Sequence, residues 1–102
     1  MFEVKLQGGV RNAHQEFSVT LGIHVFNFEM DWRTRYEEWQ VTIFVDDQVD
    51  PLVTDAVLNP GMNLLDGIFN YGRFYCYGEQ PTLENIGIDS FLIWVSDNEI
   101  RR

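Results

Sequence analysis

Residues 26–32, which read FNFEMDW, alternate strictly between apolar and polar side chains. A period of two is the repeat of an extended strand, in which successive side chains point to opposite faces. One face of this strand is therefore apolar, and the other is acidic and hydrated. The same alternation recurs over shorter lengths along the chain, so the sequence predicts an all-β fold.

The chain has 102 residues, which is enough for one domain around one core. Apolar residues make up 45% of it and aromatic residues 15%, and large rings suit pleated sheets. Burying one large apolar side chain contributes about 1.5–3 kcal/mol, so about a dozen of them offset the ordering entropy only narrowly. We therefore expect a single β domain over residues 1–102, with a subunit interface that adds stability.

The net charge of −9, from 16 acidic and 7 basic side chains, limits the possible partners. It argues against nucleic-acid binding, which needs clustered Lys and Arg, and against docking on anionic membranes. Cys76 is the single cysteine, so no internal disulfide is possible. No apolar run reaches the ~20 residues needed to cross a bilayer, and residues 1–6 do not resemble a signal peptide. We expect a protein that is made in the cytoplasm.

Periodicity also predicts the individual strands. Residues 23–32 and 39–45 are expected to form an antiparallel hairpin with their large side chains in the core. The apolar positions change parity between Val25 and Phe26, which predicts a bulge there. Pro51 lacks an N–H, so the strand that follows it is expected at an edge. The complete set of predicted strands is 2–6, 17–21, 23–32, 39–45, 52–58, 69–77 and 91–95.

One segment has the residues that typically begin a helix. Asn59 is a favoured cap and Pro60 fits the first helical position, which predicts one short helix near residues 59–66. Leu64 and Leu65 would then close one end of the core. Together with six or seven short antiparallel strands, this predicts a small β-barrel or a β-sandwich.

No constellation of residues predicts catalysis. His14 and His24 are expected to be solvated or locally bonded, and Cys76 to be a small buried residue. The aspartates in residues 46–50 lack the spacing of a calcium-binding loop, and residues 37–38 read as a solvated strand end rather than a carboxylate pair across a cleft. We therefore predict no enzyme activity, no metal site and no cofactor.

Aromatic side chains near the C-terminal end are the remaining functional candidates. If residues 69–77 and 91–95 pair, they place large side chains on both faces of the sheet. One face can be core, and the other would be an exposed apolar patch of the kind found at protein interfaces. The alternative is that all of these side chains belong to the core. The candidate contact residues are Phe69, Tyr71, Tyr75, Tyr77, Leu92 and Trp94.

Four segments follow one another in a distinctive order. They are a Gln-plus-aromatic strand with a glycine turn (15–22), a hairpin with Trp in each arm (30–32 and 39–41), a leucine–glycine–leucine-leucine stretch (58–65), and a Pro-Thr loop before the last strand (81–87 and 91–95). This order resembles the baseplate plug family of contractile-tailed bacteriophages, over about residues 2–96. Two departures concern turns, namely Gly22-Ile23-His24 and Asn59-Pro60.

This resemblance implies a structural part of the virion, in the tail baseplate near the hub and the lower end of the tube. The implied partners are other baseplate, hub and tube proteins, in a homo-oligomer of three or six copies. The resemblance also implies no enzyme activity. From the composition we expect no specific nucleic-acid binding and no membrane insertion, and a charge of −9 would repel DNA in the tail channel. The alternative is a β-barrel module for a small ligand or a carbohydrate, with Trp32, Trp39 or Trp94 as stacking platforms.

Overall fold

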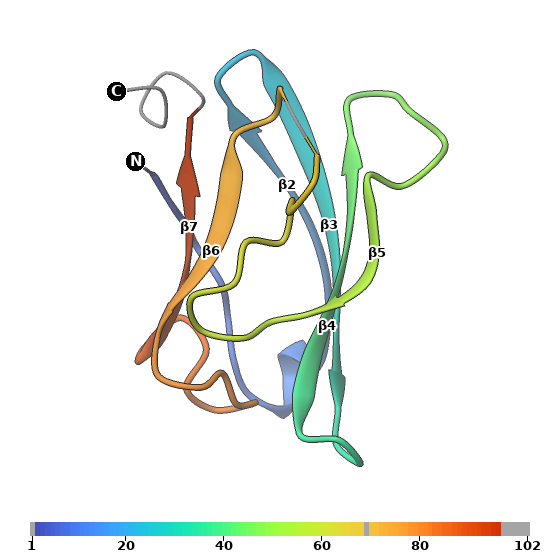
Figure 1. Ribbon diagram of the computed structural model, residues 1–102. Coiled ribbons are helices and arrows are strands. Elements are labelled where there is room, and N and C mark those ends of the chain that lie inside the picture. Colours follow the sequence, from blue (N-terminus) through green and yellow to red (C-terminus); the bar gives the residue numbers. More distant parts are fainter. Residues whose placement is uncertain (1, 69, 97–102) are drawn as a thin grey trace.

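A computed structural model describes residues 2–68 and 70–96 (Figure 1). Short strands follow one another along the chain, and the one helical element among the described residues is a single 3-10 turn. The elements are β1 (Phe2–Val4), η1 (Val10–Asn12), β2 (His14–Leu21), β3 (His24–Arg33), β4 (Glu38–Val45), β5 (Val53–Val57), β6 (Arg73–Gly78) and β7 (Ser90–Val95).

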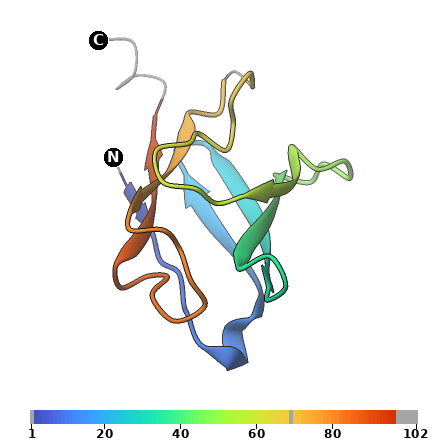
Figure 2. The same cartoon turned by 60° about the horizontal axis from the view of Figure 1, so that its bottom comes forward.

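The strands form two antiparallel sheets that face each other. One sheet has the order β1-β7-β6, and the other has the order β2-β3-β4-β5. Figures 1 and 2 show the sheets as two layers, with the connecting segments passing over the ends. The predicted all-β class is confirmed, and the arrangement is a sandwich rather than a closed barrel.

The central hairpin follows the predicted alternation. Phe26, Phe28 and Met30 on β3 are fully buried, while the residues between them face outward. β3 pairs with β4 along its length, and this register places Trp32 opposite Trp39. The predicted hairpin is therefore confirmed, and its apolar stripe covers one side of the core.

The predicted bulge at Val25–Phe26 is wrong. β2 and β3 pair without a register shift, and a two-residue turn of Gly22 and Ile23 joins them. Gly22 has a φ of +64°, which is the conformation that a type II′ turn requires at its first central position. Ile23 is 91% exposed in that turn, so it is not part of the strand's alternation. The apparent parity change marks the end of the turn.

The predicted helix near residues 59–66 is also wrong. This segment runs beside β6, and the N–H groups of Gly61 and Leu64 donate to β6 carbonyls at 2.8 Å each. The Oδ1 atom of Asn63 accepts from the N–H of Phe74 on β6, at 3.1 Å. These bonds satisfy backbone groups that a helix would satisfy internally, and Gly61 has a φ of +82°, outside the helical region. Pairing with a distant strand therefore overrides the local helix signals.

The core lies between the two sheets. Phe74 on β6 meets Phe26 and Phe28 on β3 edge to face, with ring centroids 5.2 and 5.3 Å apart. Leu64 and Leu65 lie in this core, as expected, although no helix holds them there. The other fully or nearly buried apolar residues are Val4, Leu6, Leu21, Met30, Trp39, Val41, Ile43, Val45, Leu58, Cys76, Ile86 and Leu92.

A candidate assembly surface on the three-stranded sheet

The outward side of β6 and β7 is apolar. Phe74 and Cys76 on β6, and Leu92 on β7, point into the core. Because side chains alternate along a strand, the residues between them point away from the core. We name this set the β6–β7 outer face, and it consists of Tyr75, Tyr77, Phe91, Ile93 and Val95.

Strand pairing joins these side chains into one patch. Tyr77 lies opposite Phe91, and Tyr75 lies opposite Ile93. Directly opposite residues on one face of an antiparallel pair have Cβ atoms about 4.5–5.5 Å apart, so their side chains touch. Tyr77 is 70% exposed and the others are half-buried. Figure 1 shows this sheet as the outer layer on its side of the described chain.

Charged residues lie at the margin of the patch. The Nη1 group of Arg73 donates to the hydroxyl of Tyr75 at 3.0 Å. On β1, Glu3 lies opposite Ile93 and forms an ion pair with Lys5 at 3.6 Å. An apolar centre with a charged rim is the usual anatomy of a protein–protein interface.

The structure separates the predicted contact residues into two groups. Tyr75 and Tyr77 lie on the β6–β7 outer face, whereas Leu92 is fully buried in the core. Trp94 also faces the core side, and its Nε1 donates to the Tyr71 carbonyl at 3.0 Å, while Tyr71 packs on the core. The sixth predicted residue, at position 69, lies outside the described residues.

Three residues of the patch were missing from the predicted set. They are Phe91, Ile93 and Val95, all on β7. The signal for them was present, because β7 is apolar at odd as well as even positions, which is typical of a strand covered on both faces. Choosing the odd positions requires knowing which side of β7 faces the other sheet.

Comparison with known protein families identifies the kind of assembly. A family model described as the cyanophage baseplate Pam3 plug gp18 matches residues 1–98. The chain belongs to this family. The family places the protein in the virion, as a structural component of the tail baseplate. No curated protein matches the sequence.

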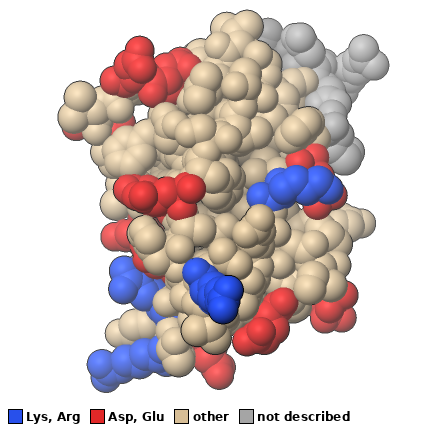
Figure 3. All heavy atoms as spheres, turned by 180° about the vertical axis from the view of Figure 1, so that it is seen from behind, with Lys and Arg blue, Asp and Glu red and all other residues tan. Residues whose placement is uncertain are grey.

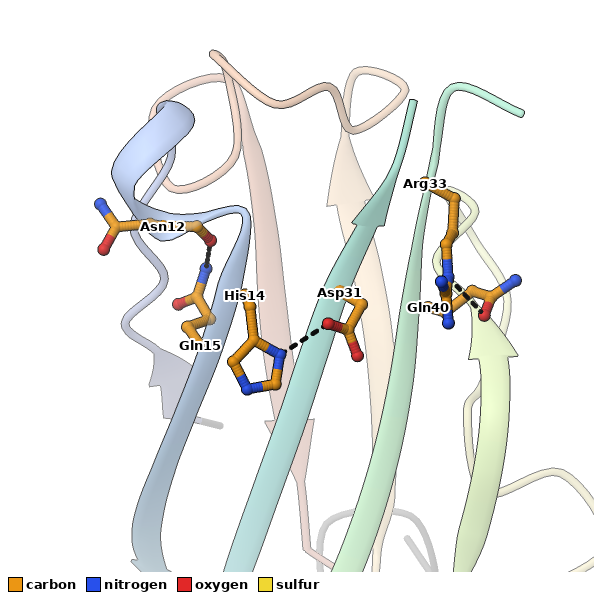
Figure 4. Close-up of polar contacts among 6 residues, drawn as sticks. All are labelled: Asn12, His14, Gln15, Asp31, Arg33 and Gln40. Carbon is orange, nitrogen blue, oxygen red and sulfur yellow. Dashed lines mark hydrogen bonds and ion pairs between the residues drawn. The ribbon is translucent and has the colours of Figure 1, made fainter. Parts of the chain in front are cut away.

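The opposite outer face of this plug-family protein is mainly polar, although Val25 and Phe44 also lie on it. It is formed by the outward residues of β2, β3 and β4. Nδ1 of His14 and Oδ1 of Asp31 are 2.6 Å apart across β2 and β3 (Figure 4). The neighbouring cross-strand pair is Glu16 opposite Glu29, and a hydrogen bond between them raises the pKa of Glu29. The carboxylate of Asp31 raises the pKa of His14 through its hydrogen bond.

The other ionisable candidates have structural surroundings. Asp46 accepts from the N–H of Val25 at 2.9 Å and lies 2.7 Å from His24, and these bonds lower the pKa of the Asp46 carboxyl. Burial raises the pKa of the Cys76 thiol, and its Sγ lies 3.5 Å from the hydroxyl of Ser90. A raised pKa disfavours the thiolate that a nucleophile needs. Within residues 2–68 and 70–96, no cluster of three or more His, Cys, Asp or Glu has a metal-binding arrangement.

The tryptophans of the alternative ligand-binding function are poor stacking platforms. Trp39 is fully buried, and its Nε1 donates to the Thr82 carbonyl at 3.0 Å, which joins β4 to the loop before β7. Trp32 packs edge to face on Trp39 at 5.7 Å, and Trp94 is half-buried against the core. A stacking platform needs an open ring face, so this arrangement favours a structural role for all three.

Charge on the surface is mainly acidic. Figure 3 shows one side of the molecule, where the basic side chains lie apart from one another among acidic groups and wide uncharged areas. Single basic residues of this kind do not form the continuous stripe that phosphate backbones require. The described residues include no helix that is both long enough and apolar enough to span a bilayer.

Proposed function

We infer that the protein is a subunit near the central hub, at the lower end of the tail tube, and that it acts through contacts with other baseplate proteins rather than as an enzyme. Membership of the baseplate plug family supports the general role. The β6–β7 outer face supports the mode of action. It is the observation on which the proposal depends, because Tyr77 alone leaves 70% of its surface open beside other large apolar side chains.

Burying this face against a partner would be favourable for two reasons. Removing large apolar side chains from water contributes roughly 1.5–3 kcal/mol for each one that is fully covered. Tyrosine is also enriched at the residues that dominate interface energies, because it combines a large ring with a hydroxyl. Arg73 and Glu3, on the rim, would then set the orientation of the partner more than its affinity.

The two outer faces suggest how the subunit is oriented. The apolar face turns toward a hub or tube protein, and the acidic face on the other sheet then turns away from that contact. The chain has a net charge of −9, and the carboxylates on this second face suit a position beside the channel, where DNA must pass without binding. Three or six copies would match the symmetry of a tail hub or tube.

The first prediction tests the contact surface in the assembled particle. Tyr77→Lys places a charge on the most exposed residue of the apolar face, and we expect it to lower incorporation into virions at least about tenfold, since an interface tyrosine of this kind contributes roughly 2 kcal/mol or more. A phage that lacks the native gene would be complemented with each variant. The measurement is the amount of the subunit in purified particles, by quantitative mass spectrometry.

Thr54→Lys is the matched control, because it adds the same charge at an exposed position on β5, away from the β6–β7 outer face. Circular dichroism and thermal unfolding would establish that both variants fold. We expect Thr54→Lys to be incorporated like the native chain. Normal incorporation of a folded Tyr77→Lys variant would show that this face is not the contact.

A further inference from the structure

The edge of β2 stands out among the four edges of the two sheets. β1 is only three residues long, and the outer edge of β6 is covered by bridges from Pro60 and Asn63. β5 follows Pro51, and its register shifts between Val41 and Ile43. Short length, coverage, proline and irregular register are the usual protections of an exposed edge. β2 has eight residues, a continuous register with β3, and neither proline nor lysine.

The hydrogen bonds of β2 show which backbone groups are free. The N–H of Trp32 donates to the carbonyl of Ala13 at 2.7 Å, just before β2. Because the register continues without a shift, the odd-numbered residues of β2 also direct their N–H and C=O groups toward β3. In an antiparallel pair the residues between them direct their groups the other way. Glu16, Ser18 and Thr20 therefore present N–H and C=O groups along the open edge, and no described strand pairs with them.

The space beside this edge has the shape of a shallow groove. A groove of about 390 Å³ lies between the first half of β2 and the side chains of Gln7 and Lys5, which is paired with Glu3, and Phe17 lies in its wall. Phe17 is half-buried and stacks on Phe28 at 5.0 Å, and Val19 follows it on the same face. The side chain of Gln15 closes one end, through bonds to the carbonyls of Gln7 at 2.8 Å and of Asn12 at 3.1 Å (Figure 4 shows the second). A strand beside β2 would rest its alternate side chains on Phe17 and Val19.

Charge indicates the nature of the occupant. The outer side chains next to the edge include Glu16 and Glu29, which lie opposite each other, and Asp31 beside His14. A second copy of the chain would bring the same carboxylates and a further net charge of −9. Lysine or arginine at every second position of an added strand would instead lie within reach of these groups. Like charges disfavour self-pairing, and opposite charges favour a basic strand.

We propose that β2 accepts an extended segment of another protein as a fifth strand of the four-stranded sheet, and that apolar residues alternate with lysine or arginine in this segment. The apolar residues cover Phe17 and Val19, and the basic residues face Glu16 and Glu29. Main-chain hydrogen bonds to Glu16, Ser18 and Thr20 supply affinity, while the alternation supplies register. This surface is separate from the β6–β7 outer face and does not depend on the function proposed for it.

The test uses the full chain and a labelled peptide of alternating lysine and valine, about seven residues long to match the strand. A peptide of alternating glutamate and valine is the control. Fluorescence anisotropy measures binding, and amide hydrogen exchange by NMR locates it. We expect the lysine peptide to bind at least about tenfold more tightly than the glutamate peptide. It should protect the amides of Glu16, Ser18 and Thr20.

Two variants of the edge make the test specific. Ser18→Pro removes an outward N–H, at a place where the fold tolerates proline, and we expect it to weaken peptide binding by about tenfold or more. Ser18→Ala loses the same hydroxyl, which bonds Asn27 at 2.5 Å, but keeps the N–H, and we expect it to bind within about twofold of the native chain. Glu16→Lys tests the charge on an exposed side chain, without altering the backbone, and should also weaken binding.

Three outcomes of the peptide experiments would overturn the proposal, and a fourth would come from the chain alone. The three are no binding of the lysine peptide, equal binding of both peptides, and binding without protection of the three outward amides. Protection of these amides in a dimer of the chain alone would show that the occupant is a second copy, against the proposal. Tyr77→Lys should leave peptide binding unchanged, so failure here and failure of the assembly surface can be distinguished.

Discussion

Single residues show where the fold tolerates no side chain. Gly87 has a φ of +85°, and a Cβ there would lie 2.3 Å from the carbonyl oxygen of Leu6. Gly61 has a similar φ of +82°, but a Cβ there would have no neighbour within 4 Å. The two glycines therefore have the same backbone requirement, and only Gly87 has the steric one.

Substituting these glycines separates the two effects. Gly61→Ala should lower the free energy of unfolding by about 1–2 kcal/mol, which is the cost of a left-handed backbone with a Cβ. Gly87→Ala should lower it by more, because the loop before β7 must also move away from the segment after β1. Urea unfolding followed by tryptophan fluorescence measures both. Equal losses would mean that the loop relaxes freely, against the close packing at Leu6.

Pairs of strands determine the local electrostatics. Glu16 and Glu29 are acidic in sequence but become partners only through the β2–β3 register. Their hydrogen bond is the largest cause of the raised pKa of Glu29, followed by burial and by repulsion from the Glu16 charge. A carboxyl with a raised pKa holds its proton more tightly in the folded chain than in the unfolded one. The fold therefore gains stability when Glu29 is protonated.

The sign of this effect can be measured. Stability from Glu29 is fully present below its ordinary pKa of 4.5 and is lost as the pH rises through the raised value. Glu29→Gln removes the carboxylate whose ionisation lowers the stability. We therefore expect this variant to be more stable than the native chain at pH 7, and no more stable than the native chain at pH 4. Urea midpoints at the two pH values test it. Glu84→Gln, which removes the same charge from an exposed loop, is the control, and an equal gain in both variants would contradict the pairing.

The whole molecule has two outer faces of different chemistry. The outer face of β6 and β7 is apolar, and the outer face of β2 and β3 contains carboxylates. Membership of the baseplate plug family implies contacts with other baseplate proteins, which the apolar face can supply. The excess of 16 acidic over 7 basic side chains fits the position beside the DNA channel that we propose.

Absence of DNA binding is testable at low salt, where phosphate contacts are strongest. We expect no retardation of duplex DNA in a gel-shift experiment at about 50 mM salt, because counterion release requires several clustered basic side chains. A complex that dissociates as salt is raised would contradict this expectation. A basic tail protein or histone preparation serves as the positive control for the assay.

The sequence predicted most of the strands and indicated that the outer side of β7 is covered, but it did not predict which residues form the candidate site. Alternation located the strands, and the apolar character of β7 on both faces indicated a covered outer side. The helix near residues 59–66 failed because Asn63 and its neighbours bond to β6, which is distant enough that no local pattern reveals it. The predicted bulge was wrong because Ile23 is a residue type typical of strands but lies in the turn between β2 and β3.

Side-chain periodicity is a local property, so the chain alone specified the strands, the central hairpin and the apolar stripe at Phe26, Phe28 and Met30. It did not determine whether the even-numbered or the odd-numbered side chains of β7 point into the core. It therefore did not determine whether Leu92 or Ile93 can contact another protein. That choice depends on where Phe74 and β3 lie across the core. The sequence likewise does not show that β2 is an edge strand, because this depends on how the other strands pair in the sheet.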